Sequence, residues 1–272
     1  MTQQEQLFAL FAQAKLYDLA HPIEMTMPVS PNHPGFKLAL QRRHGDMVRA
    51  DGGSAANEMM MFGGHTGTHV DALCHVSHNG LLYGGVDAYE AQRGGKFKTH
   101  DVAAIPLTVC RGVMLDLPAL KKVDTLAPGT PVTANDLAQA AERQHVAVRA
   151  GDVVLIRTGW AAHWSDPVKF LGHAEGVPGP DESAAQWLIE RGVRLTGAET
   201  IAYECIHAGR GHALLPVHRM LLVESGIHII EAMNLTPLAE ARVSEFLFVM
   251  TPLKVVGATG VPIRPVAVVT GE

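Results

Sequence analysis

The sequence predicts a single mixed α/β domain with barrel-like or swivelled sheet packing, and three observations favour this fold class. A chain of 272 residues is long enough to bury one sizeable core. Its hydrophobic content of 47% and charged content of 18% are typical of a folded globular protein. Helical and extended patterns alternate along the chain, but without the regular rhythm of a doubly wound sheet. Because no repeat, low-complexity tract or linker divides the chain, residues 1–272 are expected to form one domain.

The first third of the chain combines one helical pattern with extended segments. Apolar residues recur at helical spacing near the N-terminus, so residues 1–16 are expected to form an amphipathic helix that extends from the domain. Repeated prolines in 22–36 indicate an ordered loop or the wall of a binding site. Two extended segments follow, at 37–43 and 56–62, and the methionines of the second are expected to pack a strand beside the functional site.

The rest of the chain carries clearer signals. Thr133 and Asp136 form a variant of the capping box and so predict a helix over 130–144. Proline and acidic residues at its start, with arginine and glycine at its end, predict another helix over 180–192. The remaining expected elements are strands ending at 114–117 and spanning 152–160, a helix over 217–226, a strand over 227–235 and two closing strands within 245–269.

Composition excludes several classes of partner. The net charge of −5 gives no electrostatic basis for binding nucleic acid or an anionic membrane. No run approaches the roughly 18 apolar residues of a membrane span, and the N-terminus lacks the pattern of a signal peptide. Three cysteines in a chain of this size favour a reduced compartment, so the protein is expected to be cytoplasmic.

The stretch 63–80, GGHTGTHVDALCHVSHNG, contains the densest cluster of chemically active side chains. Its glycines oppose a helix, and in an extended chain the Cα atoms of His69 and Asp71 would lie about 7 Å apart on one face. His65 would lie about 13 Å from His69 on a straight strand, but a bend at Gly67 would bring it back. The spacing therefore predicts a bent loop that presents two imidazoles and one carboxylate together.

Two imidazoles and a carboxylate leave coordination positions open on Zn²⁺ or Mn²⁺, as a catalytic metal requires. His75 lies four residues beyond Asp71, within reach of the site, and is a candidate general acid and base. Cys74 and His78 are interpreted as structural neighbours. Other catalytic systems find no support, because the chain has no P-loop, no glycine-rich dinucleotide motif and no GxSxG elbow.

The motif HTGTHVDALCH resembles the HxGTHxDxxxH signature of the cyclase family of metal-dependent hydrolases, which includes kynurenine formamidases and isatin hydrolases. Similar segments extend the resemblance over residues 17–269. They are YDLAHPIEMTMPVSPNHPGF, LIRTGW, GIHIIEAMNL and PLKVVGATGVPIRPVAVV. The resemblance implies a swivelling β/β/α fold with helices around a barrel-like sheet. It also implies a homo-oligomer, a dimer or a tetramer.

By the same resemblance His65, His69 and Asp71 would ligate the metal, as one or two ions, and His75 would move the proton. The family's later histidine and carboxylate would be His218 and Glu231.

The interval between His218 and Glu231 is one residue longer than the family pattern, which leaves His212, with Glu224 downstream, as an alternative pair. The tryptophan that lines the pocket of kynurenine formamidases is also absent. In its place the chain offers His33 and Phe36 as substrate-binding candidates, so a different substrate is expected.

The expected activity is hydrolysis of an amide or cyclic amide C–N bond in a small organic substrate. Two alternatives remain open on the sequence. One is a lactone or ester hydrolase that uses the same residues, and the other is a protein that binds metal or ligand without catalysis.

Overall fold

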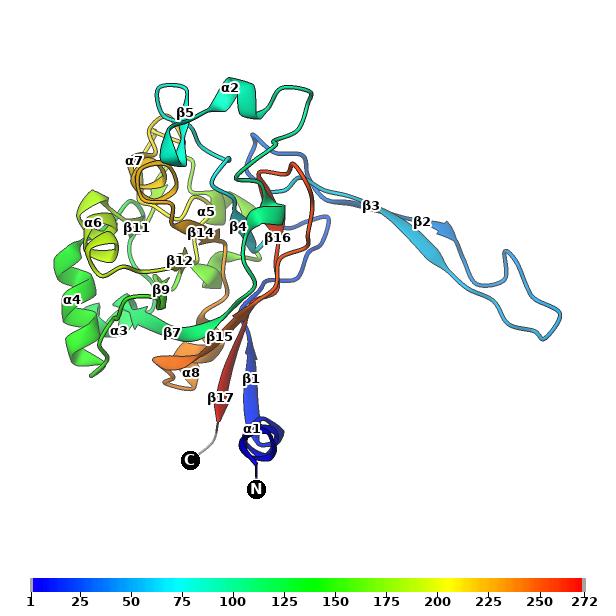
Figure 1. Cartoon of the computed structure of the whole chain (residues 1–272), viewed down its shortest axis with the longest axis horizontal. Coiled ribbons are helices and arrows are strands. Elements are labelled where there is room, and N and C mark those ends of the chain that lie inside the picture. The colour runs from blue at the N-terminus through cyan, green and yellow to red at the C-terminus, as the bar shows by residue number, and fades with distance from the viewer. Residues whose placement is uncertain (1, 271–272) are drawn as a thin grey trace.

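A nine-stranded sheet organises the chain, which the computed structural model describes over residues 2–270 (Figure 1). From one edge to the other its strands are β1 (Ala14–Asp18), β17 (Val266–Thr270), β15 (Glu245–Met250), β7 (Thr108–Asp116), β9 (Val153–Arg157), β12 (Leu195–Ala198), β14 (His228–Glu231), β4 (His69–Asp71) and β16 (Gly260–Pro262). The central strands β7, β9, β12 and β14 run parallel, and the others pair antiparallel. The sheet is strongly curled, as the fold class predicts.

Both faces of the central strands are buried. In β9 the side chains of Val153 and Leu155 join one apolar core, while those of Val154 and Ile156 join another on the opposite face. This separation follows from the two-residue alternation of a strand, and burial on both faces is typical of parallel strands covered by helices.

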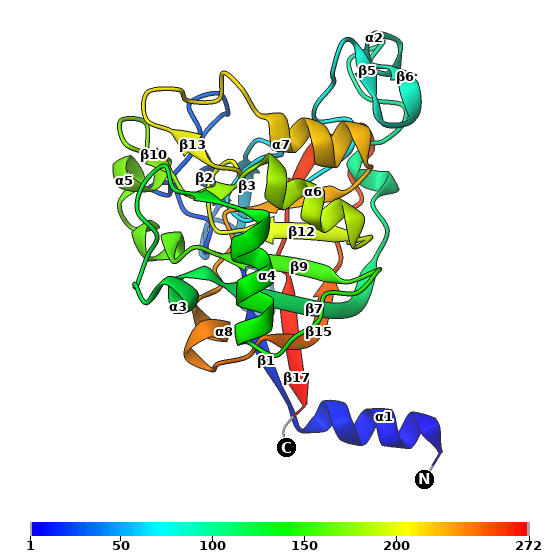
Figure 2. The same cartoon turned by 90° about the vertical axis from the view of Figure 1, so that its left-hand side faces the viewer.

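Helices cover one face of the sheet. Figure 2 shows α4 (Ala134–Arg143) and α6 (Glu182–Glu190) in front of β7, β9 and β12, with α7 (Pro216–His218) above them. The other helices are α1 (Gln3–Ala12), α2 (Ala88–Ala91), α3 (Leu117–Lys121), α5 (Pro167–Leu171), α8 (Thr236–Glu240), three 3₁₀ turns, η1 (Tyr83–Gly85), η2 (Val102–Ala104) and η3 (Trp160–His163), and the π-helix η4 (Arg219–Glu224). No helix among the described residues is long and apolar enough to cross a membrane.

Short two-stranded ribbons complete the fold. They are β2 (Lys37–Arg42) with β3 (Asn57–Met61), β5 (Leu81–Leu82) with β6 (Val86–Asp87), β8 (Pro131–Val132) with β11 (Gly179–Pro180), and β10 (Gly176–Val177) with β13 (Ile206–His207). The ribbon of β2 and β3 projects far from the rest of the molecule (Figure 1).

Several elements follow the sequence closely. Thr133 caps α4, since its hydroxyl accepts from the Asp136 amide at 3.2 Å while Asp136 accepts from the Thr133 amide at 3.0 Å. The predicted helix over 180–192 is α6, and the predicted strand over 152–160 is β9.

Four expectations need correction. The N-terminal helix ends at Ala12 rather than at residue 16, because Ala14–Asp18 pair with β17 instead. The segment 245–269 contains three strands rather than two. The helix expected over 217–226 is the single turn α7 followed by the π-helix η4. The methionines of β3 are exposed on the projecting ribbon, so they do not pack beside the site.

Candidate metal centre

Strand β4 presents two candidate ligands on one face. His69 and Asp71 alternate with Val70, whose side chain is fully buried in the core on the other face. Gly67, with φ +60°, turns the chain immediately before this strand. In the neighbouring strand β14, Glu231 lies directly opposite His69, so the antiparallel pairing brings a second carboxylate to the same place.

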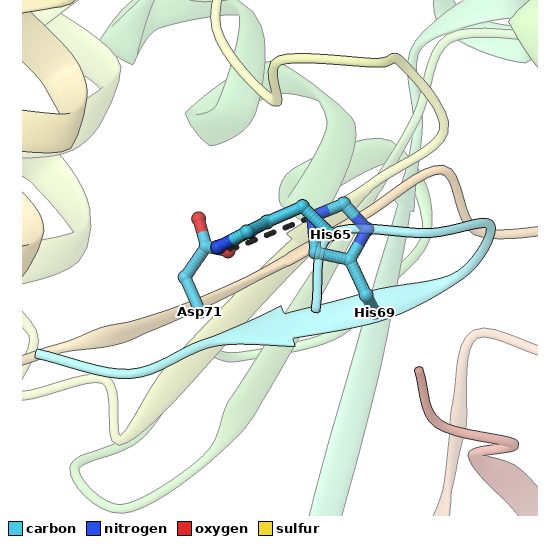
Figure 3. Close-up of side chains that lie close together, drawn as sticks. All are labelled: His65, His69 and Asp71. Atoms are coloured by element: carbon cyan, nitrogen blue, oxygen red, sulfur yellow. Dashed lines mark ion pairs between the residues drawn. The ribbon is translucent and has the colours of Figure 1, made fainter. Parts of the chain in front are cut away.

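His65 reaches the cluster from the loop before β4. Its Nδ1 lies 2.8 Å from Oδ1 of Asp71, and Figure 3 shows the side chains of His65, His69 and Asp71 close together. The loop approaches β16 so closely that a Cβ at Gly64 would lie 2.4 Å from the Gly260 carbonyl oxygen, and a Cβ at Gly260 would lie 2.5 Å from the His65 ring. Both glycines are therefore required by this packing.

His218 joins the group from α7. Its Nε2 lies 3.0 Å from Oε1 of Glu231 and 3.7 Å from Oδ2 of Asp71. Donor atoms of His65, His69 and Asp71 lie within 4.8 Å of one another, and those of Asp71, His218 and Glu231 do the same. The five side chains thus form two ligand groups that share Asp71.

Unpaired buried atoms make this cluster suitable for a cation. Nε2 of His69 and both carboxylate oxygens of Asp71 are buried, and apart from the close contacts within the cluster they have no hydrogen-bond partner. Ligand atoms about 2.0–2.1 Å from a tetrahedral ion would lie roughly 3.3 Å apart. Nε2 of His69 is 3.5 Å from Oδ1 of Asp71 and 3.2 Å from Oε2 of Glu231, so the spacing fits a divalent ion held by nitrogen and oxygen.

Neighbouring groups orient each imidazole toward the cluster. Nδ1 of His69 donates to the Gly67 carbonyl at 2.8 Å, which leaves Nε2 free for a ligand. Nε2 of His65 is 3.0 Å from the Thr259 hydroxyl, so its Nδ1 faces Asp71.

Glu204 holds His218 in the same way. The ring Nδ1 of His218 donates to Oε1 of Glu204 at 2.7 Å, and the carboxylate also accepts from the backbone amides of Val217 and His218 at 3.1 and 2.8 Å. Glu204 and Thr259 could not be identified from the sequence, because they lie 14 and 194 residues from the histidines they contact.

Buried negative charge dominates the electrostatics. Burial disfavours the charged form of His69, but Glu231 and Asp71 outweigh it and raise the pKa of His69 to about 9. Burial also lowers the pKa of His218, but hydrogen bonds and charge from Glu204 and Glu231 outweigh this effect and raise that pKa to about 10. Burial also acts against ionisation of Asp71, but the surrounding histidines hold its pKa well below the usual range. The cluster therefore favours positive charge at its centre.

His75 lies beside the ligands. Its ring centroid is 3.9 Å from that of His65 and 6.4 Å from that of His218. Burial lowers the pKa of His75 to about 4 despite the nearby charge of Asp71. The imidazole is therefore neutral near pH 7 and able to accept a proton.

The structure brings some of the other candidates to the site and not others. His33 stacks on His65 at 5.0 Å between centroids and lines the site, whereas Phe36 packs on Phe62 at 6.4 Å and does not line it. His212 lines the site without joining either ligand group. Its partner in the alternative assignment, Glu224, is instead bound to Arg219.

Cys74 and His78 do not join the cluster either. The thiol of Cys74 is buried under the loop that carries Ala258, and burial raises its pKa to about 12. His78 is exposed and pairs with Leu81 through the backbone.

Two cavities adjoin the cluster. The one directly over it has a volume of about 40 Å³, enough for two or three waters but not for an organic molecule. A larger cavity of about 640 Å³ lies beside it and shares His212 and Leu215 with it. The loop that carries these two residues therefore separates the larger cavity from the ligands.

Comparison with known proteins gives consistent matches. The model of the family described as "Putative cyclase" matches residues 17–205. An isatin hydrolase from Roseibium aggregatum is 28% identical over 224 residues, which is 81% of this chain and 77% of that protein.

Two solved structures show the same fold. One is described as a novel cyclase and has a TM-score of 0.83 at 27% identity, over 98% of this chain and 93% of the other. The other, isatin hydrolase A from Ralstonia solanacearum, has a TM-score of 0.75 at 24% identity, over 99% and 98%.

Proposed function

Because the chain belongs to the cyclase family, we propose that it is a metal-dependent hydrolase that opens an amide or cyclic amide C–N bond of a small organic substrate. The proposal is supported by the similarity to an isatin hydrolase. One structural observation carries it: four buried side chains with nitrogen and oxygen donors, His65, His69, His218 and Glu231, converge around Asp71, whose carboxylate oxygens have no partner outside this cluster.

His65, His69 and Asp71 would hold the ion, and His218 and Glu231 would complete its coordination or hold a second one. Nitrogen and oxygen donors suit zinc and manganese, which we propose as the physiological metals. A bound ion of this kind supplies Lewis-acid chemistry, because it lowers the pKa of water and polarises a carbonyl oxygen.

His75 is proposed as the proton carrier. The neutral imidazole accepts a proton from the attacking water, and the resulting imidazolium donates it to the leaving nitrogen. Burial favours the second transfer, since it disfavours the imidazolium once the proton has been accepted. Glu231 fixes the ring of His218 through the 3.0 Å contact and keeps a carboxylate facing the reaction centre.

The substrate is proposed to bind where the two cavities meet. His212 and Leu215 border both, and His33 also lines the small cavity. His33 can donate a hydrogen bond to a substrate, and Phe36, which packs on Phe62, would act by fixing the segment that carries His33. Specificity then depends on the loop 207–215 and on the segment 30–36.

Assembly and location are also proposals. We place the protein in the cytoplasm as a homo-oligomer, without nucleic acid or membrane partners. The three free cysteines, of which Cys74 is buried and the others are half-buried, support a reducing compartment.

A substrate screen tests the proposed reaction. Protein stripped of metal and reloaded with zinc or manganese would be incubated with formamides, cyclic amides and lactones. Ring opening of a cyclic amide by the reloaded protein alone would support the proposal. Turnover confined to lactones or esters would contradict the C–N assignment, and tight metal binding without turnover of any class would indicate a binding protein.

A further inference from the structure

A turn from Ser30 to His33 borders the small cavity over the ligand cluster. The His33 amide donates to the Ser30 carbonyl at 2.9 Å, and Pro31 occupies the second position of the turn, where proline is favoured. Ser30 and His33 both line the cavity of about 40 Å³. One short turn therefore brings two polar residues to the ligands.

Packing holds this turn against the loop that carries His65. The His33 ring stacks on that of His65, with 5.0 Å between the centroids. Pro34 lies so close to Gly63 that a Cβ at Gly63 would be 3.1 Å from the proline ring. Ser30 itself is only 4% exposed. The fold itself therefore fixes the place of Ser30 beside the ligands.

The Ser30 hydroxyl has no partner within the protein. Over residues 2–270 only two side-chain hydroxyls are buried without a hydrogen-bond partner, those of Ser30 and Thr66. Ser30 lines the small cavity, whereas Thr66 does not. A buried hydroxyl without a partner lowers stability, because it has lost its hydrogen bonds to water. Such a group at the wall of a reaction cavity is typical of a side chain that binds the reacting molecule.

The cavity is small enough for its occupant to reach this hydroxyl. A volume of about 40 Å³ accepts a group of the size of two or three waters, so a carbonyl group placed there touches the walls. The position of a hydroxyl hydrogen is not fixed, and it rotates toward whichever acceptor is nearby. Ser30 can therefore donate to the reacting group without movement of the main chain.

The other polar groups of the cavity indicate which acceptor this hydroxyl serves. Glu231 presents a carboxylate to the same cavity and so disfavours negative charge on a substrate oxygen. Burial lowers the pKa of His75 to about 4, so its neutral ring acts as a proton acceptor in the first step. Ser30 adds a donor hydrogen to the cavity without adding charge. The carbonyl oxygen benefits most from such a donor, because it gains negative charge during the reaction.

We propose that Ser30 is a catalytic residue whose hydroxyl donates a hydrogen bond to the carbonyl oxygen of the substrate. As water adds to the carbonyl carbon, the π electron pair moves to this oxygen, and the hydrogen bond stabilises its negative charge. When the carbonyl re-forms, the C–N bond breaks, and its electron pair leaves with the nitrogen, which takes the proton from His75. This inference rests on the proposed hydrolysis and adds to it a donor from outside the ligand cluster.

The Ser30→Ala variant is expected to change rate and stability in different directions. Its kcat for a cyclic amide should fall about 10–100-fold with little change in KM, because the hydrogen bond is strongest when the oxygen is charged. Its free energy of unfolding should stay the same or rise, because the hydroxyl has no protein partner to lose. A merely structural serine would show the reverse, a loss of stability with an unchanged kcat.

Two further variants complete the kinetic test. Ser30→Cys keeps the approximate size of the side chain but offers only a weak donor, so its kcat should fall nearly as far as that of the alanine variant. Ser165→Ala makes the same change at an exposed position that lines neither cavity, and it should keep the wild-type kcat. A folded Ser30→Ala variant with the wild-type kcat would overturn the proposal.

Binding of formate to the zinc-loaded protein tests Ser30 independently of turnover. Formate is about the size of two or three waters and offers charged oxygens to the hydroxyl. Calorimetry is expected to show about tenfold weaker binding to Ser30→Ala than to the wild type. If the wild type hydrolyses nothing, weakened formate binding would refute the proposed hydrolysis and keep Ser30 as the donor. Equal affinities in that case, or no binding of formate at all, would overturn the role of Ser30 as well.

Discussion

Replacement of Glu204 by alanine tests how His218 is held at the proposed metal site. The carboxylate accepts the Nδ1 hydrogen of His218 at 2.7 Å, and this bond directs Nε2 toward Asp71 and Glu231. Loss of such an orienting partner typically weakens metal binding 10–100-fold. That range corresponds to about 1.4–2.7 kcal/mol, which agrees with the roughly 1.5–3 kcal/mol of a hydrogen bond to a charged group.

Glu204→Gln separates orientation from charge. An amide oxygen in the place of Oε1 still accepts from Nδ1 and from the His218 amide, while the amide nitrogen faces only the Val217 N–H. We therefore expect glutamine to restore most of the affinity that alanine loses. Glu224→Ala is the control, because Glu224 is exposed and contacts Arg219 outside the cluster.

The assay is competition for zinc or manganese with a chromophoric chelator, alongside denaturant unfolding of the metal-free variants. Alanine also frees two backbone amides of α7, so a lower unfolding free energy is expected in addition. If folded Glu204→Ala bound metal as tightly as the wild type, the orienting role would be wrong.

Three further outcomes are expected. The His69→Ala variant should lose its metal in equilibrium dialysis, since it lacks the buried imidazole that lies beside the Asp71 and Glu231 carboxylates. Metal retention at the wild-type level would exclude His69 as a ligand. His75→Ala should retain metal but lose about 10²–10⁴-fold in kcat, and unchanged turnover would remove its role. His21 stacks on Trp164 at 4.1 Å, and burial lowers its pKa from 6.5 to about 4. Between these pH values unfolding takes up a proton at His21, so this residue lowers the free energy of unfolding by up to about 3 kcal/mol as pH falls from 6.5 to 4. His21→Phe should reduce this loss of stability. An unaltered pH dependence of the denaturation midpoint in the variant would contradict the expectation.

Helix caps and turns can be predicted from the sequence where the residues that determine them lie close together in the chain. The cap of α4 depends on Thr133 and Asp136, three residues apart, and the bend at Gly67 follows from glycine in a crowded motif. The same motif led us to expect His65, His69 and Asp71 in one group, and the structure brings their donor atoms within 4.8 Å.

Contacts between distant segments could not be predicted in this way. Glu204 has no motif around it, and its role depends on where α7 lies over β14. The methionines of β3 predict a packed strand because they lie on both of its faces, and only the three-dimensional arrangement shows that the ribbon leaves the body. The prediction of two strands within 245–269 is wrong because Gly260–Pro262 forms a separate strand that pairs with the distant strand β4.

The rate of cyclic amide hydrolysis before and after metal removal tests the central claim most directly. Chelator-treated protein is expected to lose the activity and to regain it when zinc or manganese is added back. Full activity in protein shown by elemental analysis to contain no metal would contradict the account.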